Sequence, residues 1–129
     1  MTAYLLDATV VFAAACGEQA TLARLARLEG ADVATSAVVW SELMAVGPER
    51  DLRLAENIRL IGETIDILPF DRASAEAFGD LLQELEPKRR RVLDRMVAAQ
   101  ARALGRTLTT LNASDFKDIR GLTIEDWSS

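Results

Sequence analysis

The chain has 129 residues, half of them hydrophobic and 27% charged, with a formal net charge of −5, which fits one globular domain spanning residues 1–129. It has one cysteine and no histidine, which excludes intramolecular disulfides, zinc sites built from these residues, and Ser-His-Asp or Cys-His catalysis. Chemistry must therefore come from carboxylates, hydroxyls, Lys or Arg, and a bound metal would be a hard, oxygen-liganded ion such as Mg²⁺ or Mn²⁺.

Short apolar runs of strand length alternate along the chain with longer segments whose apolar residues recur at helical spacing. This alternation predicts an α/β domain of three layers, in which a mostly parallel central sheet of four to five strands carries helices on both faces. The expected strands cover residues 4–6, 33–36, 65–68, 107–110 and 122–124, and the expected helices cover residues 19–29, 37–45, 49–62, 71–86 and 92–104.

Capping and breaking residues set several of these helix ends. Ser36 is placed to cap the helix that follows the second strand. Gly47 and Pro48 are expected to break that helix, and Gly105 to end the helix of residues 92–104. We expect the single cysteine, Cys16, to be a small core residue.

Nothing in the sequence predicts a membrane segment or an export signal. No apolar run approaches the roughly 20 residues needed to cross a bilayer. The N-terminus lacks the charged start of a secretory signal. We therefore expect a cytoplasmic protein that does not associate with a membrane.

Basic residues are concentrated in one segment. Residues 88–106 contain seven of the fifteen Lys and Arg residues and a single acid, Asp94, so this segment carries +6 and the remainder −11. Its first four residues lie just before Asp94, and arginine binds phosphate bidentately, a contact that positions a nucleic acid without reading its sequence. The alternative is an ordinary solvated loop. The candidate nucleic-acid-binding residues are Lys88, Arg89, Arg90 and Arg91.

Three acids occupy positions where the surrounding pattern predicts burial. Asp7 follows the first strand, Glu42 lies in the helix after the second strand, and Asp94 lies in an otherwise apolar helix. Each taken singly is more simply a turn, solvated or salt-bridged carboxylate, since charged residues are seldom buried unpaired. Three converging carboxylates would repel one another unless a cation neutralised them, so together they favour a divalent ion.

The expected sheet brings some of these residues together. In parallel sheets the site lies outside the carboxyl ends of the strands, and both Asp7 and the turn of residues 110–115 leave strands at that edge. Mg²⁺ typically takes one or two protein carboxylates together with substrate phosphate oxygens. Such an ion can activate water for attack on a phosphodiester.

Six segments spread over the chain form an ordered series. They are YLLDAT at residues 4–9, TSAVVWSEL at 35–43, ILPFD at 67–71, LDRMVAAQA at 93–101, TLNASDF at 110–116 and GLTIEDW at 121–127. In this order they resemble the blocks of PIN-domain ribonucleases of the VapC toxin type. The resemblance covers nearly the whole chain.

This resemblance implies a PIN-like fold and a Mg²⁺- or Mn²⁺-dependent endoribonuclease, the toxin of a type II toxin–antitoxin module. Such toxins are usually homodimers that a small VapB-type antitoxin holds inactive. The family roles imply that Asp7, Glu42 and Asp94 are the catalytic, metal-binding carboxylates.

The chain departs from the family pattern at three places. The fourth family position, often acidic, falls on Asn112, and Asp115 three residues later is a further candidate for the metal. Thr9 stands where the family usually has Asn or Ser, and the loop before Asp94 is replaced by residues 87–91. These departures keep open an alternative function, a PIN-like binding protein with weak or lost catalysis.

Two other acidic α/β families fit less well. A receiver domain of two-component signalling needs paired acids near the end of the first strand and a late catalytic lysine, but no paired acids precede Asp7 and the only later lysines are Lys88 and Lys117. A phosphatase of the haloacid dehalogenase type needs a second aspartate where Thr9 stands. Neither pattern is met.

Overall fold

The computed structural model describes residues 2–87 and 92–128, with the backbone alone at residues 47–50. Its centre is a five-stranded sheet in the order β3-β2-β1-β4-β5, and every neighbouring pair of strands is parallel. The predicted parallel sheet is thus confirmed. The strands are Ala3–Leu6 (β1), Asp32–Ser36 (β2), Asp66–Leu68 (β3), Thr107–Thr110 (β4) and Ile124–Asp126 (β5).

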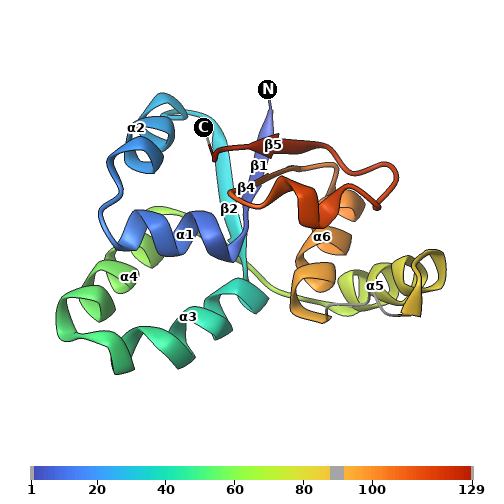
Figure 1. Ribbon diagram of the computed structural model, residues 1–129, viewed down its shortest axis with the longest axis horizontal. Helices are drawn as coiled ribbons and strands as arrows, with labels where there is room; N and C mark the ends of the chain where they lie inside the picture. The colour runs from blue at the N-terminus through green and yellow to red at the C-terminus, as the bar shows by residue number, and fades with distance from the viewer. Residues whose placement is uncertain (1, 88–91, 129) are drawn as a thin grey trace.

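Helices cover both faces of this sheet, as the sequence predicts. Figure 1 shows α1, α2 and α4 on one side and α5 and α6 on the other. Helix α3 contacts both α4 and α6. The helices are Ala8–Ala15 (α1), Gln19–Arg27 (α2), Ala37–Arg50 (α3), Leu52–Thr64 (α4), Arg72–Glu84 (α5) and Val92–Leu104 (α6), and the 3₁₀ helix Ala113–Phe116 (η2) follows β4.

The central strand β1 is buried because sheet neighbours flank it and helices cover it. Leu5 pairs in register with Ala34 of β2 and with Leu108 of β4, and all three side chains are fully buried. Apolar residues of α1 and α6, among them Val10 and Ala98, complete the core on the two faces. This packing fixes the carboxyl ends of β1 and β4 side by side.

Three sequence expectations need correction. Helix α3 runs through Gly47 and Pro48 to Arg50, because a proline near the end of a helix removes one backbone hydrogen bond without forcing the packed turns before it to unwind. Helix α4 begins at Leu52, where the Asp51 side chain accepts a hydrogen bond from the Leu54 amide. Cys16 is exposed, since it lies at the C-terminal end of α1 and not inside it.

The predicted caps are present. The Ser36 hydroxyl accepts a hydrogen bond from the Val38 amide at the start of α3. Gly105 follows α6 with a φ of 67°, a left-handed conformation that favours glycine. Both residues therefore act at the helix ends where the sequence places them.

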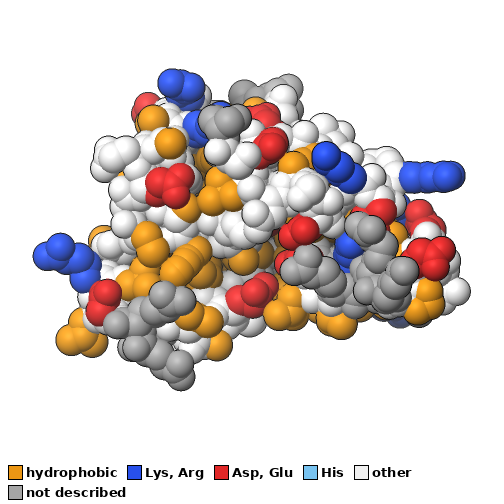
Figure 2. All heavy atoms as spheres, viewed as in Figure 1, with side chains coloured by type: hydrophobic (Ala, Val, Ile, Leu, Met, Phe, Trp, Pro, Cys, Tyr) orange, Lys and Arg blue, Asp and Glu red, His pale blue; other side chains and the backbone are white. Residues whose placement is uncertain are grey.

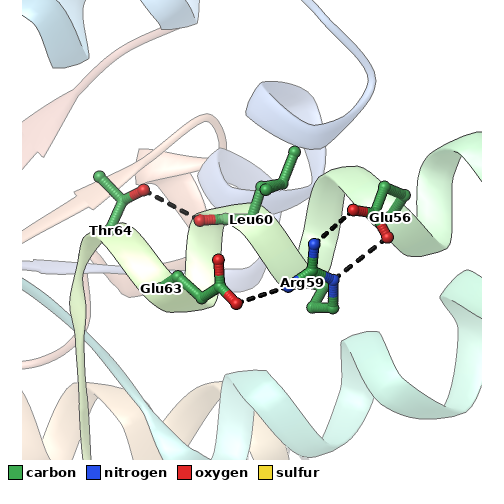
Figure 3. A network of polar contacts seen from close by, with 5 residues as sticks. All are labelled: Glu56, Arg59, Leu60, Glu63 and Thr64. Carbon is green, nitrogen blue, oxygen red and sulfur yellow. Dashed lines mark hydrogen bonds and ion pairs between the residues drawn. The ribbon is translucent and has the colours of Figure 1, made fainter.

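Helix α4 carries an exposed cluster of charges on its outer face. Figure 3 shows Arg59 between Glu56 and Glu63, with hydrogen bonds to both carboxylates. Pairs at this spacing on an exposed helix contribute little to stability. The cluster therefore marks the solvent side of α4 and does not position the site.

In the described parts of the chain, no helix is long and apolar enough to cross a bilayer.

Candidate functional site

Asp7 occupies the end of the central strand, where β1 turns into α1. It caps this helix, and its Oδ1 accepts hydrogen bonds from the Val10 amide at 3.0 Å and from the Thr9 hydroxyl at 2.6 Å. The residue is only 6% exposed. The sequence therefore placed this acid correctly, at the buried carboxyl edge of the sheet.

Burial raises the pKa of Asp7 above its ordinary value, since desolvation disfavours the charged form. Hydrogen bonds from the side chains of Thr110 and Thr9 and from the Val10 amide act in the opposite direction, and the charge of Asp94 raises the pKa further. Holding this carboxylate ionised is thus costly without a nearby positive charge.

Glu42 in α3 and Asp94 in α6 lie within electrostatic range of each other and of Asp7. Desolvation raises the pKa of Glu42, and the charges of Asp94 and Asp7 raise it further. Helices α3 and α6 pack against each other, which brings these two acids of distant sequence together. The three carboxylates that the sequence selects are therefore close enough to repel one another.

The donor set fits a hard divalent cation in its chemistry, because three mutually repelling carboxylates gain from a positive charge between them. Within residues 2–87 and 92–128, however, no three acidic or cysteine side chains are already arranged around a common metal position. Mg²⁺ commonly uses only one or two protein carboxylates and retains several waters, so a closed three-ligand cluster is not required.

Thr9 and Thr110 connect Asp7 to the carboxyl end of β4, the strand beside β1 in the sheet. The Thr9 hydroxyl oxygen accepts a hydrogen bond from the Leu111 amide at 3.0 Å and lies 3.5 Å from the Thr110 hydroxyl oxygen. Thr110 is fully buried at the end of β4 and is absent from the residues selected by sequence. A polar residue at the carboxyl end of a central strand is the signal that could have identified it.

Asn112 and Asp115 lie in the turn after β4. Asn112 precedes η2 and is exposed, and its backbone carbonyl accepts a hydrogen bond from the Asp115 amide at 3.0 Å. Asp115 is half-buried in the first turn of η2. Whether either residue completes a metal site stays a prediction.

The predicted basic segment is partly neutralised in the fold. Lys88, Arg89, Arg90 and Arg91 lie outside the described residues. The three basic residues that follow them are all in ion pairs, which reduces the positive charge that residues 88–106 present to a ligand. These pairs join Arg95 to Asp118, Arg102 to Glu84 and Arg106 to Asp32.

Apolar grooves flank Glu42 on both sides. One groove is lined by residues of α1, α3 and α4, including Phe12 and Ile58, and the other by residues of α3 and α6, including Val46 and Leu93. Figure 2 shows hydrophobic side chains gathered where α1, α3 and α4 meet, with acidic side chains beside them. The candidate site thus combines a carboxylate centre with apolar walls.

Comparisons with known proteins identify the family of this chain. The PIN domain family matches residues 4–122. The chain is 30% identical to the tRNA(fMet)-specific endonuclease VapC of Shigella flexneri over 99% of this chain and 100% of that protein. It is 29% identical to the protein of the same name from Salmonella typhimurium, over 70% of this chain and 67% of that protein.

Solved structures show the same fold. A chain of the Rickettsia felis VapBC2 complex bound to a promoter DNA fragment superposes with a TM-score of 0.88 at 24% identity, covering 98% of this chain and 99% of that chain. A chain of the DNA-bound VapBC complex of Salmonella typhimurium gives a TM-score of 0.79 at 26% identity, with the same coverage. By sequence match and by fold, this chain belongs to the PIN-domain family, in its VapC-type group.

Proposed function

We propose that the protein is a metal-dependent endoribonuclease that acts as the toxin of a type II toxin–antitoxin pair. The observation that carries this proposal is Asp7, buried at the carboxyl edge of the sheet within electrostatic range of Asp94, with the charges of both acids also acting on Glu42. The relatives named as endonucleases support the same reaction class. Such a toxin would act in the cytoplasm.

The proposed cofactor is Mg²⁺, with Mn²⁺ as a substitute. Bound there, it would activate water and stabilise the charge on a phosphodiester undergoing in-line displacement. The chain's own residues would hold the ion and orient its ligands, and the apolar walls beside Glu42 would limit access of bulk water. The proposed ligands are Asp7, Glu42, Asp94 and Asp115, supported by Thr9 and Asn112.

Cleavage of RNA by the purified protein tests the proposal. We expect cleavage with Mg²⁺ or Mn²⁺, none with EDTA, and none in folded Asp7→Asn or Asp94→Asn variants. Asp80→Asn, which changes an exposed aspartate of α5, is the control for charge removal and should cleave like the wild type. Full activity in either folded site variant would refute the site assignment.

The alternative is a PIN-like binding protein with weak or lost catalysis. Asn112, where the family often has an acid, is the observation that favours it, since an amide oxygen contributes no charge to a metal site. Folded protein that binds RNA with Mg²⁺ or Mn²⁺ present but leaves it intact would support this alternative over the nuclease.

We propose a VapB-type antitoxin as the protein partner. Two similar solved structures are VapBC complexes, and the apolar grooves beside Glu42 offer a surface next to the carboxylates. A VapB-type protein encoded beside this one should copurify with it and inhibit cleavage. A neighbouring protein that neither binds nor inhibits would contradict the pairing.

We also propose that the protein is a homodimer. Large apolar side chains are exposed on α3, α4 and α6, including Met44, Leu93 and Leu52, the last being 87% exposed. From the sequence, residues 49–62 and 71–86 are the candidate surfaces, but among the described residues α5 has no exposed large hydrophobic side chain. Light scattering at micromolar concentration should report about twice the 14.1 kDa monomer mass.

A further inference from the structure

Two threonine hydroxyls connect the turn after β4 to the carboxylate of Asp7. The Leu111 amide donates to the Thr9 hydroxyl oxygen, and the Asn112 amide donates to the Thr110 hydroxyl oxygen, both at 3.0 Å. These are the first two amides after β4. The start of the turn is thus anchored on side chains that lie next to Asp7.

One of these hydroxyls donates to the carboxylate, and the other reaches it through the first. A threonine hydroxyl has one proton to donate and lone pairs that accept. With its oxygen occupied by the Leu111 amide, Thr9 donates its proton to Asp7 Oδ1 at 2.6 Å. Thr110 accepts from the Asn112 amide, and its hydroxyl oxygen lies 3.5 Å from the Thr9 hydroxyl oxygen. Because the Thr9 proton is donated to Asp7, the Thr110 proton is left for Thr9.

We propose that Thr110 is a positioning residue: together with Thr9, it joins the turn carrying Asn112 and Asp115 to the carboxylate of Asp7, so that these groups keep one fixed arrangement toward a divalent cation. This inference rests on the proposed metal-dependent function. Groups that orient metal ligands typically change metal affinity by about 10- to 100-fold when they are removed.

The neighbouring residue of the same strand provides a matched control. Thr109 is as fully buried as Thr110, but within the described part of the chain its hydroxyl oxygen has no hydrogen-bond partner. Replacing either threonine by valine keeps the shape of the side chain and removes one buried hydroxyl. Only the change at position 110 removes a hydroxyl that bonds to the turn and contacts Thr9, the hydroxyl donor to Asp7.

The experiment measures Mn²⁺ binding by titration and amide hydrogen exchange of the metal-free protein by NMR. In Thr110→Val we expect the dissociation constant for Mn²⁺ to rise about 10-fold or more, and the Asn112 amide to exchange faster. Thr110→Ser, which keeps the hydroxyl, should stay within about twofold of the wild type, and Thr109→Val should match the wild type in both measurements.

Equal Mn²⁺ affinity in Thr110→Val and Thr109→Val would overturn the positioning role while the proposed function stands. A Thr110→Ser protein as weak as Thr110→Val would also overturn it, since side-chain shape and not the hydroxyl would then matter. A wild-type protein that binds no Mn²⁺ would overturn the proposed metal-dependent function. In that case unchanged Asn112 exchange in Thr110→Val would overturn the connection between the turn and Asp7, and faster exchange would support it.

Discussion

Arg95 and Asp118 form a two-point ion pair, in which Arg95 Nη1 lies 3.1 Å from Asp118 Oδ1 and Nη2 lies 3.3 Å from Oδ2. Arg95 is 1% exposed and follows Asp94 in α6, whereas Asp118 follows η2, which carries Asp115. The pair therefore joins the helix of one proposed metal ligand to the segment of another.

Removing the carboxylate of this pair should destabilise the protein strongly. Asp118→Asn replaces the carboxylate that pairs with buried Arg95 at two points by a neutral amide, which should lower the unfolding free energy by about 3 kcal/mol. Arg95→Met should cost less, because the half-buried Asp118 then keeps access to water. Urea denaturation measures both, with Glu84→Gln, which breaks an outer pair to Arg102, as the control of small effect. Equal destabilisation in Asp118→Asn and Glu84→Gln would contradict the assigned importance of the buried pair.

Asp7→Asn should stabilise the metal-free protein at neutral pH. The folded-state pKa of Asp7 is raised above its ordinary value of 3.8, chiefly by burial, so the folded state binds a proton more readily and stability falls as pH rises through this range. Asparagine also caps helices. The melting temperature of Asp7→Asn in EDTA should therefore exceed that of the wild type at pH 7, and the difference should shrink toward pH 4.

Asp71→Asn is the control for which we expect the opposite change in melting temperature. Asp71 caps α5, and hydrogen bonds from the backbone and side chain of Ser74 lower its pKa. A lowered carboxyl pKa contributes stability above the unfolded-state pKa, and this contribution is lost as pH falls through the folded-state pKa. Asp71→Asn should thus melt below the wild type at pH 7 and converge with it in acid. The same sign in both variants would contradict the assigned role of burial at Asp7.

Replacing a glycine by alanine should have opposite effects on stability in helices α4 and α5. A Cβ at Gly62 in α4 would lie 2.5 Å from the Trp40 ring of α3, so Gly62→Ala should cost about 1–3 kcal/mol through overpacking. A Cβ at Gly79 in α5 meets nothing within 4 Å, so Gly79→Ala should stabilise by about 0.5–1 kcal/mol. Thermal or urea unfolding compares the two, and a stabilised Gly62→Ala would mean that Trp40 moves aside without cost.

The basic run at residues 88–91 should contribute to RNA binding. Replacing Arg89, Arg90 and Arg91 by Ala should weaken binding and reduce the salt slope by about 0.7 for each arginine that neutralises a phosphate of a single strand. The control replaces three arginines that are paired with glutamates by Ala, which removes the same total charge. It should reduce RNA affinity and the salt slope less. Equal effects in the two triple variants would assign the change to net charge alone. The arginines replaced in the control are Arg59, Arg72 and Arg102.

Local patterns were sufficient to predict most of the fold. Residues 92–104 and 107–110 form the helix and strand expected from apolar spacing, and Ser36 caps its helix as expected, because periodicity and capping act over a few neighbouring residues. The predicted end of α3 was wrong because the rules used to place it are also local. Local rules take Pro48 as a break, whereas packing of the preceding turns against α4 and α6 is a tertiary property.

For the site, the sequence by itself determined which acids stand out, since Asp7, Glu42 and Asp94 interrupt apolar patterns and fall in segments typical of one family. Only the tertiary structure decided which partners the residues beside these acids bond to. Arg95 is paired with Asp118, 23 residues away, and Thr9 with the Leu111 amide, 102 residues away. Such contacts depend on which strands and helices pack together, so no local spacing rule could predict them.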